Sequence, residues 1–164
     1  LDFLTTPSLR WLISYFVNIR ANCLEKFVDN EFDKDLSFAD VSEIYFFLGC
    51  YYVDDEYTKK DIEKTRYYLN LSVNLNNSRA QCSLGLYYNN IVFDIEKTLY
   101  YLGLSAEKNN PKALANLGII YFQGVKVPKD TEKAEYYFTL CGKIKDYFFL
   151  NLIGDHYFYD FQVD

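Results

Sequence analysis

The sequence lacks methionine altogether and has only one histidine, one tryptophan and three prolines in 164 residues. A single histidine, His156, is too few for a histidine-rich metal site, and we see no nucleophile–base pair in which it takes part. No phosphate-binding loop, dinucleotide-binding glycine motif or HExxH motif occurs. We therefore expect no catalytic residue, no cofactor and no metal site, and we predict that the chain is not an enzyme.

Long apolar runs and an excess of basic residues are also missing. The best candidate for a membrane-spanning segment, from Trp11 to Ile19, is interrupted by Ser14 and Asn18 and falls well short of the roughly 18 residues that such a helix needs. The formal net charge is −6, whereas nucleic-acid binders need basic faces that displace counterions. We therefore expect no membrane insertion and no nucleic-acid partner.

Cysteines are few and widely separated, at Cys23, Cys50, Cys82 and Cys141, with no CxxC pair. Two disulfides remain an alternative, but the spacing favours four reduced thiols, mostly buried, since free cysteine packs as a small apolar residue. Reduced thiols favour a cytoplasmic location. The sequons at Asn70 and Asn76 keep the secretory lumen, or a secreted effector, as alternatives.

Aromatic residues are abundant instead, with 17 tyrosines and 14 phenylalanines, and half of the residues are apolar. A chain of this composition and length can bury a real core. From Leu9 to about Asp29 the apolar residues recur at helical spacing, and residues 30–39 break the period. Asp40 and Glu43 then predict a capping box that begins the next helix. We expect residues 1–39 to form a leading helix and loop, and residues 40–164 a repeat array.

Four glycines define the repeat, at Gly49, Gly85, Gly118 and Gly154, separated by 36, 33 and 36 residues. Each follows an aliphatic residue and precedes a tyrosine by three positions. A period of 33–36 residues indicates a solenoid. Because glycine disfavours a helix interior by about 1 kcal/mol, its recurrence predicts a close crossing of two helices. The matching tyrosines, which we expect to pack against the second helix of each repeat, are Tyr52, Tyr88, Tyr121 and Tyr157.

A second set of anchors follows each glycine. Asp61, Asp94 and Asp130 each begin a D-x-E-K sequence, which leads to a Tyr-Tyr pair. A carboxylate at this place predicts the N-cap of a second helix. The Tyr-Tyr pairs predict one buried member each. The connection before the aspartate varies: Gly124 suits a left-handed turn in one copy, whereas Ile91-Val92-Phe93 replace the glycine in another.

The stretch Ala113–Lys143 has the pattern A-x4-G-x2-Y-x2-G-x2-V-x2-D-x2-KA-x2-Y and resembles the Sel-1-like repeat family, a relative of the tetratricopeptide repeats. Two weaker copies precede it, and a fourth begins at Tyr147 and stops at Asp164, near where its aspartate is due. The resemblance implies an all-α fold, a right-handed α-solenoid of antiparallel helix pairs. We expect about three and a half repeats plus the leading helix, truncated at the C-terminus.

The resemblance also implies a protein–protein interaction scaffold or adaptor whose partner is an unidentified protein. We expect the partner segment to bind the concave face, lined by the first helix of each repeat, through aromatic and amide side chains. The candidate residues are Tyr51, Tyr87, Asn89, Asn116, Ile120 and His156. The alternative function is a stoichiometric inhibitor or assembly factor that docks on a large complex through its ends or its convex face.

Overall fold

The computed structural model describes residues 23–26, 37–53 and 61–144. Residues 23–26 are helical, and they are the only described part of the predicted leading helix. The rest of that helix, most of the loop at 30–39, the fourth repeat copy and His156 lie outside the described residues. The expected boundary between residues 39 and 40 stays a prediction.

Every regular element among the described residues is a helix, as predicted. The elements are α2 (Phe38–Val53), α3 (Ile62–Asn74), α4 (Ser78–Tyr87), the π-helical turn η1 (Tyr88–Val92), α5 (Ile95–Ala106), α6 (Pro111–Gln123) and α7 (Thr131–Ile144). In the first repeat, helix A is α2 and helix B is α3. In the second, helix A is α4 with η1 and helix B is α5, and in the third, helix A is α6 and helix B is α7.

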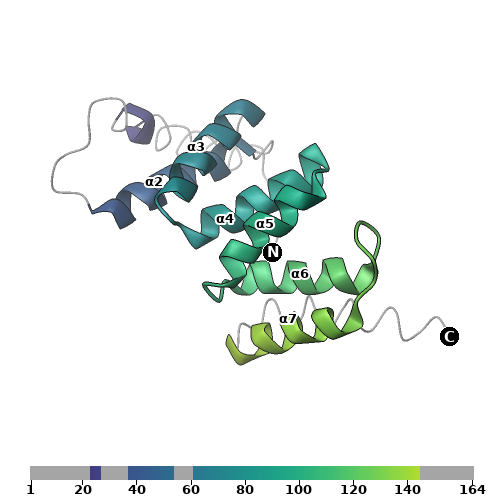
Figure 1. The fold of residues 1–164 in the computed structure, drawn as a ribbon. Helices are drawn as coiled ribbons and strands as arrows, with labels where there is room; N and C mark the ends of the chain where they lie inside the picture. Colours follow the sequence, from purple (N-terminus) through teal and green to yellow (C-terminus); the bar gives the residue numbers. More distant parts are fainter. Residues whose placement is uncertain (1–22, 27–36, 54–60, 145–164) are drawn as a thin grey trace, which may run out of the picture. The chain divides into compact units, whose positions relative to one another are not determined.

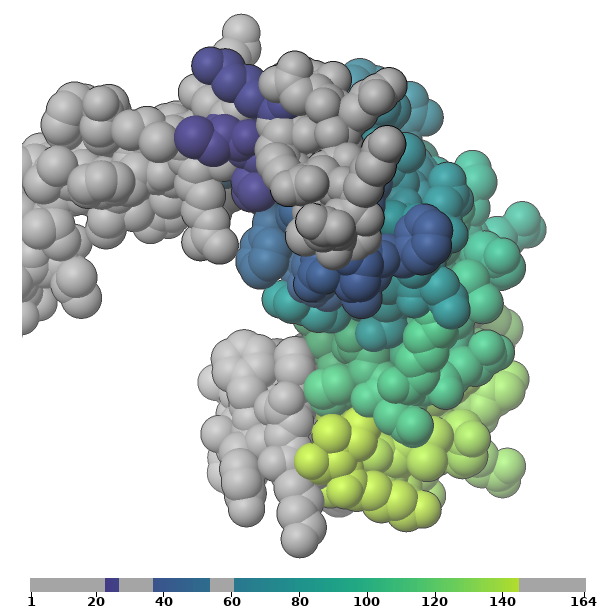
Figure 2. All heavy atoms as spheres, turned by 90° about the vertical axis from the view of Figure 1, so that its left-hand side faces the viewer, coloured from purple at the N-terminus to yellow at the C-terminus, as the bar shows by residue number. Residues whose placement is uncertain are grey.

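Contacts divide the chain into two compact units, residues 1–80 and 81–164. In the first unit α2 packs against α3, and in the second α5 packs against η1 and α6, and α6 against α7. Figure 1 shows α6 and α7 side by side and antiparallel. In the space-filling view of Figure 2 the atoms of α6 and α7 meet with no opening on the face shown. These pairs confirm the predicted antiparallel helix pairs.

Each unit has its own apolar core. In the first unit Leu48 and Tyr68 are buried, with partly buried side chains around them. The larger core of the second unit joins α4, α5, α6 and α7, and its most completely buried members include Leu102, Ala113, Leu114 and Ala134. Burial of these apolar side chains contributes most of the stability of the packed helices. Single helices of this length are only marginally stable in water by themselves.

The repeated glycines lie where helix B approaches helix A. A Cβ on Gly49 would come within 2.7 Å of the Leu69 side chain, and one on Gly85 within 2.8 Å of Leu102. On Gly118 it would overlap the ring of Phe138. A missing side chain on helix A therefore makes room for a large one on helix B. The predicted crossing is confirmed in all three described copies.

The predicted aspartate caps are also present. Asp61, Asp94 and Asp130 each accept a hydrogen bond from the backbone N–H of the lysine three residues later, at 3.0, 3.0 and 2.9 Å. Asn110 caps α6 in the same way, bonding the N–H groups of Lys112 and Ala113, with Pro111 in the first turn. These bonds satisfy donors that have no partner within the helix.

The cap of α2 was predicted at the wrong residue. The helix begins at Phe38, so Ser37 is the capping residue and Asp40 its third helical position. The Ser37 hydroxyl accepts a bond from the Asp40 N–H at 3.2 Å, and the Asp40 carboxylate accepts one from the Ser37 N–H at 3.3 Å. This is a capping box displaced by three residues from the expected one. Glu43, the expected second member, binds other residues instead.

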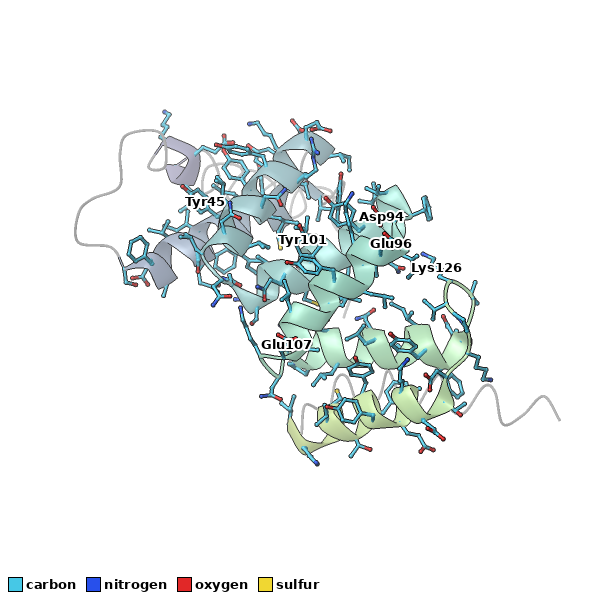
Figure 3. All side chains as sticks on the ribbon, in the orientation of Figure 1. Tyr45, Asp94, Glu96, Tyr101, Glu107 and Lys126 are labelled. Carbon is cyan, nitrogen blue, oxygen red and sulfur yellow. The ribbon has the colours of Figure 1, made fainter. Side chains whose placement is uncertain are left out.

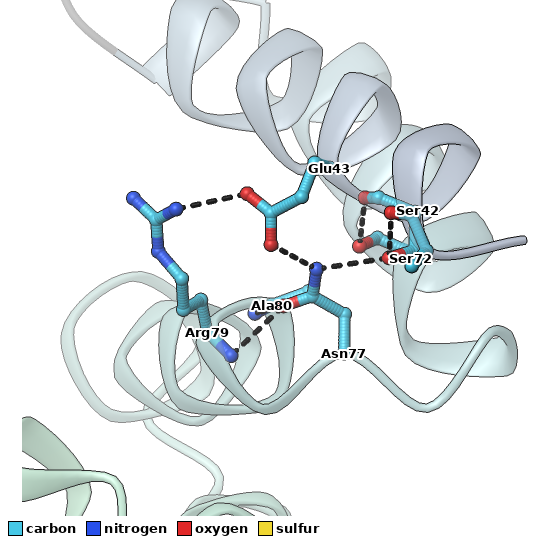
Figure 4. Close-up of polar contacts among 7 residues, drawn as sticks. Ser42, Glu43, Ser72, Asn77, Arg79 and Ala80 are labelled. Carbon is cyan, nitrogen blue, oxygen red and sulfur yellow. Dashed lines mark hydrogen bonds and ion pairs between the residues drawn. The ribbon is translucent and has the colours of Figure 1, made fainter. Parts of the chain in front are cut away.

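Glu43 belongs to a partly buried polar junction before α4 (Figure 4). The Asn77 amide donates to the Glu43 carboxylate at 2.8 Å and to the Ser42 hydroxyl at 3.2 Å, and its oxygen accepts from the N–H groups of Arg79 and Ala80. The Arg79 guanidinium pairs with Glu43 at 2.8 Å. The Asn77 amide thus caps α4 and links the first turn of α4 to side chains of α2.

The variable A–B connections use different turns. Gly124 ends α6 in the left-handed region, with φ of 65°. The second repeat has no glycine there, and Phe93 takes the left-handed conformation with φ of 61° after the π-helical turn η1. Its side chain is 73% exposed. A bulky residue at positive φ is strained, so the shorter connection stores some conformational energy.

The cysteines are free thiols, as predicted, but only half are buried. Cys82 and Cys141 lie in the core, Cys50 is half-buried and Cys23 is exposed. Burial raises the pKa of the Cys82 thiol to about 12, so it stays protonated at neutral pH. Cys82 and Cys141 therefore act as small apolar core residues.

Candidate functional site

Each described repeat carries the same cluster where helix A ends and helix B begins. The helix-A tyrosine stacks on the second tyrosine of the Tyr-Tyr pair with nearly parallel rings. The ring centroids are 6.0, 5.6 and 6.0 Å apart and the interplanar angles 11°, 4° and 9°. The stacked pairs are Tyr52–Tyr68, Tyr88–Tyr101 and Tyr121–Tyr137. The predicted packing of the helix-A tyrosines on helix B is confirmed for these three.

A backbone hydrogen bond holds the two ends together in every copy. The capping aspartate donates its N–H to the carbonyl of the helix-A tyrosine, at 3.0 Å for Asp61 and Asp94 and 2.9 Å for Asp130. The bond survives differences in loop length between copies. It therefore fixes the start of helix B at the end of helix A whatever the connection contains.

The lysine of D-x-E-K completes the cluster. Its ammonium group lies over the ring of the helix-A tyrosine, 4.5 Å from the centroid for Lys64 and 5.1 Å for Lys97 and Lys133. Such a position is favourable because the ring face is electron-rich. We call the lysine and its two stacked tyrosines the Lys–Tyr–Tyr trio of each repeat.

In the second and third repeats the lysine pairs with its own capping aspartate. Lys97 lies 3.0 Å from Asp94 and Lys133 lies 3.1 Å from Asp130. Hydrogen bonds from the lysine lower the pKa of each aspartate, and the same contact raises the pKa of each lysine. Figure 3 shows Asp94 and Glu96 at the beginning of α5 and Tyr101 further along the helix. Each lysine and its capping aspartate are therefore both charged at neutral pH.

The first repeat differs, because a carboxylate from outside the repeat occupies its trio. One oxygen of Glu25 accepts hydrogen bonds from the Tyr52 hydroxyl at 2.5 Å, the Lys64 ammonium at 2.9 Å and the Tyr68 hydroxyl at 3.0 Å. Burial raises the pKa of Glu25, but these three bonds outweigh it and lower the pKa overall. Lys64 therefore pairs with Glu25 instead of Asp61.

The first member of each Tyr-Tyr pair points outward. Tyr67, Tyr100 and Tyr136 are 60%, 61% and 60% exposed, and each contacts its neighbour edge-on at 5.0–5.3 Å. The second member is buried in Tyr68 and half-buried in Tyr101 and Tyr137. The prediction of one buried member per pair therefore holds fully only for the first repeat.

The predicted concave-face residues lie in different surroundings. Tyr51 is half-buried against Tyr52, whereas Tyr87 is only 7% exposed. Asn89 accepts two hydrogen bonds from the Lys126 ammonium, at 2.7 Å to its carbonyl and 2.9 Å to its side chain. Asn116 donates to the Lys112 carbonyl one turn earlier, and Ile120 is half-buried against the core of the second unit. Asn116 and Ile120 are one helical turn apart on α6. Their role in binding stays a prediction.

The trios were missed at the sequence level. The lysines stand in the repeated D-x-E-K pattern, so their register was visible, but nothing local indicates that they lie over a tyrosine from the preceding helix. Glu25 has no signal in the pattern at all, because its partners lie 27 to 43 residues away. Recurring lysine at one register was the available clue.

Two classes of site are absent from the described residues. No group of three or more histidine, cysteine, aspartate or glutamate side chains in residues 23–26, 37–53 and 61–144 is placed to hold a metal ion. No helix in the same ranges has the length and apolar character needed to cross a membrane. Each trio supplies one ammonium group and two hydroxyls as hydrogen-bond donors. In the first repeat these donors converge on one carboxylate.

The comparisons with known proteins agree with the geometry. The Sel1 repeat model matches three consecutive segments, residues 42–77, 78–110 and 111–140. The chain is similar in structure to a Sel1 repeat protein from Oxalobacter formigenes, with a TM-score of 0.64 and 18% identity over 83% of this chain and 40% of the other. It is also similar to c5321, a protective antigen of uropathogenic Escherichia coli strains displaying an SLR fold, with a TM-score of 0.62 and 20% identity over 92% of this chain and 33% of the other.

These structural similarities establish the fold of the chain but say nothing about its activity. At such identities the two structures show that the chain has the α-solenoid fold of stacked helix pairs. The chain spans less than half the length of either protein. Among curated proteins no sequence matches it significantly.

Proposed function

The chain belongs to the Sel1 repeat family, since matches to that repeat cover more than half of its length, and from this premise we propose that it is a non-enzymatic interaction scaffold. Members of the family generally act as protein–protein interaction scaffolds. The proposed ligand is a segment of a protein partner that binds along the helix-A face. The proposed contact residues are Tyr51, Tyr87, Asn89, Asn116, Ile120 and His156.

One observation supports this proposal above the others. The residues that recur between repeats are used inside each repeat: glycine for the helix crossing, aspartate for the cap, and tyrosine and lysine for the trio. Residues at neighbouring helix-A registers differ from copy to copy. The register two residues after the glycine holds Tyr51, Tyr87 and Ile120. Specific recognition has to come from such differing positions, because the recurring ones have structural partners.

Helix α6 offers a partly accessible part of this face. Asn116 is half-exposed, and within the described ranges its amide nitrogen bonds to the backbone of its own helix alone. Ile120, one turn later, adds partly exposed apolar area. An amide beside an aliphatic side chain supplies one directional contact and one apolar contact to a bound segment. Tyr87 contributes little surface in this conformation and contacts the Tyr88 ring edge-on.

The test compares two charge-introducing variants on the same helix. Asn116→Lys places an ammonium group on the proposed face, and Gln123→Lys places one at the exposed end of α6. We expect Asn116→Lys to lower recovery of captured partner proteins roughly fivefold or more by quantitative mass spectrometry, because interface centres tolerate charge poorly. Gln123→Lys should leave recovery unchanged. Equal recovery with both variants would contradict the helix-A face as the binding site.

A second candidate function is an inhibitor or assembly factor that docks through helix B. The exposed Tyr100 and Tyr136 favour it, because each recurs at one register with a glutamate one turn earlier, Glu96 and Glu132. Tyrosine is enriched at protein interfaces. A Tyr100→Glu, Tyr136→Glu chain in the same capture experiment separates the two: loss of partners there, with Asn116→Lys neutral, supports docking through helix B.

A further inference from the structure

The trios of the second and third repeats match a trio that already holds a carboxylate. In the first repeat, Glu25 lies on Tyr52, Lys64 and Tyr68 through three hydrogen bonds of 2.5–3.0 Å. The second repeat has Tyr88, Lys97 and Tyr101 in the same registers, and the third has Tyr121, Lys133 and Tyr137. The helices that carry them have the same caps and the same closing backbone bond.

The geometry of the three trios is closely similar. Ring separations differ by at most 0.4 Å, and all three tyrosine pairs are within 11° of parallel. The lysine lies over the helix-A ring at 4.5 Å where the carboxylate is bound and at 5.1 Å in the other two copies. Since rings and lysine are already in place, a carboxylate would meet donors arranged as they are around Glu25.

The second and third trios have unused hydrogen-bonding capacity. Among the described residues, no hydrogen bond joins the hydroxyls of Tyr88, Tyr101, Tyr121 or Tyr137 to another group, whereas both hydroxyls of the first trio bond Glu25. In the part of the chain that the structure describes, Lys97 and Lys133 form ion pairs with their capping aspartates alone. In the first repeat the equivalent lysine pairs with the Glu25 carboxylate, while its aspartate still accepts the cap bond.

We propose that the trios Tyr88–Lys97–Tyr101 and Tyr121–Lys133–Tyr137 are binding sites for glutamate side chains on a helical segment of a partner protein. The occupant is inferred from Glu25, which residues 23–26 present from a helical segment. These sites lie at the A–B junctions, so they extend the binding surface beyond the helix-A face and do not depend on it. The partner class is thus an acidic helix.

The two sites should differ in strength. Burial raises the pKa of Tyr101 and of Tyr137, so both hydroxyls remain protonated donors at neutral pH. Glu107 lies near enough to Tyr137 to raise its pKa further, and no such carboxylate acts on Tyr101. A bound glutamate in the third repeat would feel the same negative charge. We expect the second repeat to bind more tightly.

The probe is the segment that supplies Glu25. A peptide of residues 21–28, acetylated and amidated at its ends, has one carboxylate and no terminal charge. It is titrated into the full chain carrying ¹³C at the lysine Cε positions, and NMR follows each lysine. We expect millimolar peptide to shift the Lys97 signal and, at higher concentration, the Lys133 signal. The same peptide with Glu25→Gln should shift neither.

A matched pair of variants tests the hydroxyl. Tyr101→Phe removes one donor and keeps the stacked ring, whereas Tyr100→Phe changes the exposed neighbour on the same helix. We expect Tyr101→Phe to weaken binding at Lys97 about tenfold, the usual loss for a hydrogen bond to a charged group, and Tyr100→Phe to leave it unchanged.

Three results would overturn the proposal. They are equal shifts with the glutamine peptide, a shift of the Lys64 signal alone through displacement of Glu25, or no shift of any lysine signal up to the solubility limit of the peptide. None of them bears on the Asn116→Lys test, because no helix-A face residue is changed.

Discussion

At the scale of single residues, the fold depends on pairs that are complementary in size. Helix A supplies a glycine and helix B a large side chain, which is Leu69, Leu102 or Phe138 in the three repeats. The first two repeats use leucine and the third uses the larger phenylalanine, so the amount of space differs between copies. The third crossing is therefore the most sensitive to added volume.

Gly118 provides the first prediction at this scale. Gly118→Ala would place a methyl group in the ring of Phe138, and we expect it to lower the free energy of unfolding by about 1–3 kcal/mol, the usual effect of overpacking. Gly103→Ala is the control, because a Cβ there meets nothing within 4 Å. It should raise stability by up to about 1 kcal/mol through helix propensity. Urea unfolding followed by circular dichroism measures both. Equal effects would show that the crossing is looser than described.

Individual residues also show which contacts could be predicted from the sequence and which could not. Asp61, Asp94 and Asp130 were predictable as caps, since capping is local and the carboxylate bonds an N–H three residues away. Tyr52, Tyr88 and Tyr121 were predictable as packing residues because a register repeats. Glu25 was not predictable, since its three bonds cross 27 to 43 residues and its segment lies outside the repeat.

At the scale of elements, junctions differ more than helices do. Asn77 is a buried amide that bonds α2 side chains through its nitrogen and the first turn of α4 through its oxygen. Nearby, the Ser72 hydroxyl donates to the Ser42 carbonyl at 2.6 Å. The Arg79 guanidinium also lies 4.4 Å from the centroid of the Phe46 ring. The start of α4 is therefore held by directional contacts to α2.

Asn77→Asp tests this junction, because it replaces only the amide NH₂ group by an oxygen and leaves the size of the side chain nearly unchanged. The variant keeps the oxygen that caps α4, loses both donated bonds and puts a carboxylate opposite Glu43. We expect a loss of about 1–3 kcal/mol in stability near neutral pH, because buried acceptors lose their donor and like charges face each other. Asn109→Asp, at an exposed position of positive φ that aspartate tolerates, is the control and should be nearly neutral. Thermal unfolding of both variants at neutral pH measures the difference.

The errors at this scale have identifiable physical causes. The start of α2 was predicted at Asp40 because Asp40 and Glu43 have the spacing of a capping box, but Ser37 and Asp40 have it as well. Glu43 instead accepts a hydrogen bond from Asn77, just before α4, and pairs with Arg79 in the first turn of α4. The π-helical turn at 88–92 was not predicted either. A connection without glycine forces Phe93 into the left-handed region, and only the shortened spacing in the sequence hinted at it.

At the scale of the whole molecule, charge and recognition act over different distances. The chain carries a formal net charge of −6, so an acidic partner is repelled at long range. Within a trio the lysine and the two tyrosine hydroxyls attract a carboxylate over a few ångströms, as Glu25 shows in the first repeat. Glu25 reaches its trio from within the same chain. A partner has to approach through solvent, and its association is therefore the step that the net charge governs.

Salt therefore separates these two effects. Raising ionic strength from about 0.01 to 0.1 M shortens the Debye length from about 30 to 10 Å, which screens the long-range repulsion more than the contacts inside a trio. For the residue 21–28 peptide extended with acidic residues at both ends, we expect the association rate constant to rise severalfold over this range and the dissociation rate constant to change less. Stopped-flow fluorescence of a labelled peptide measures both. A lysine-extended peptide is the control and should associate more slowly as salt is added. An association rate that falls with salt for the acidic peptide would mean that the field near the trios is positive, and that the net charge does not govern approach.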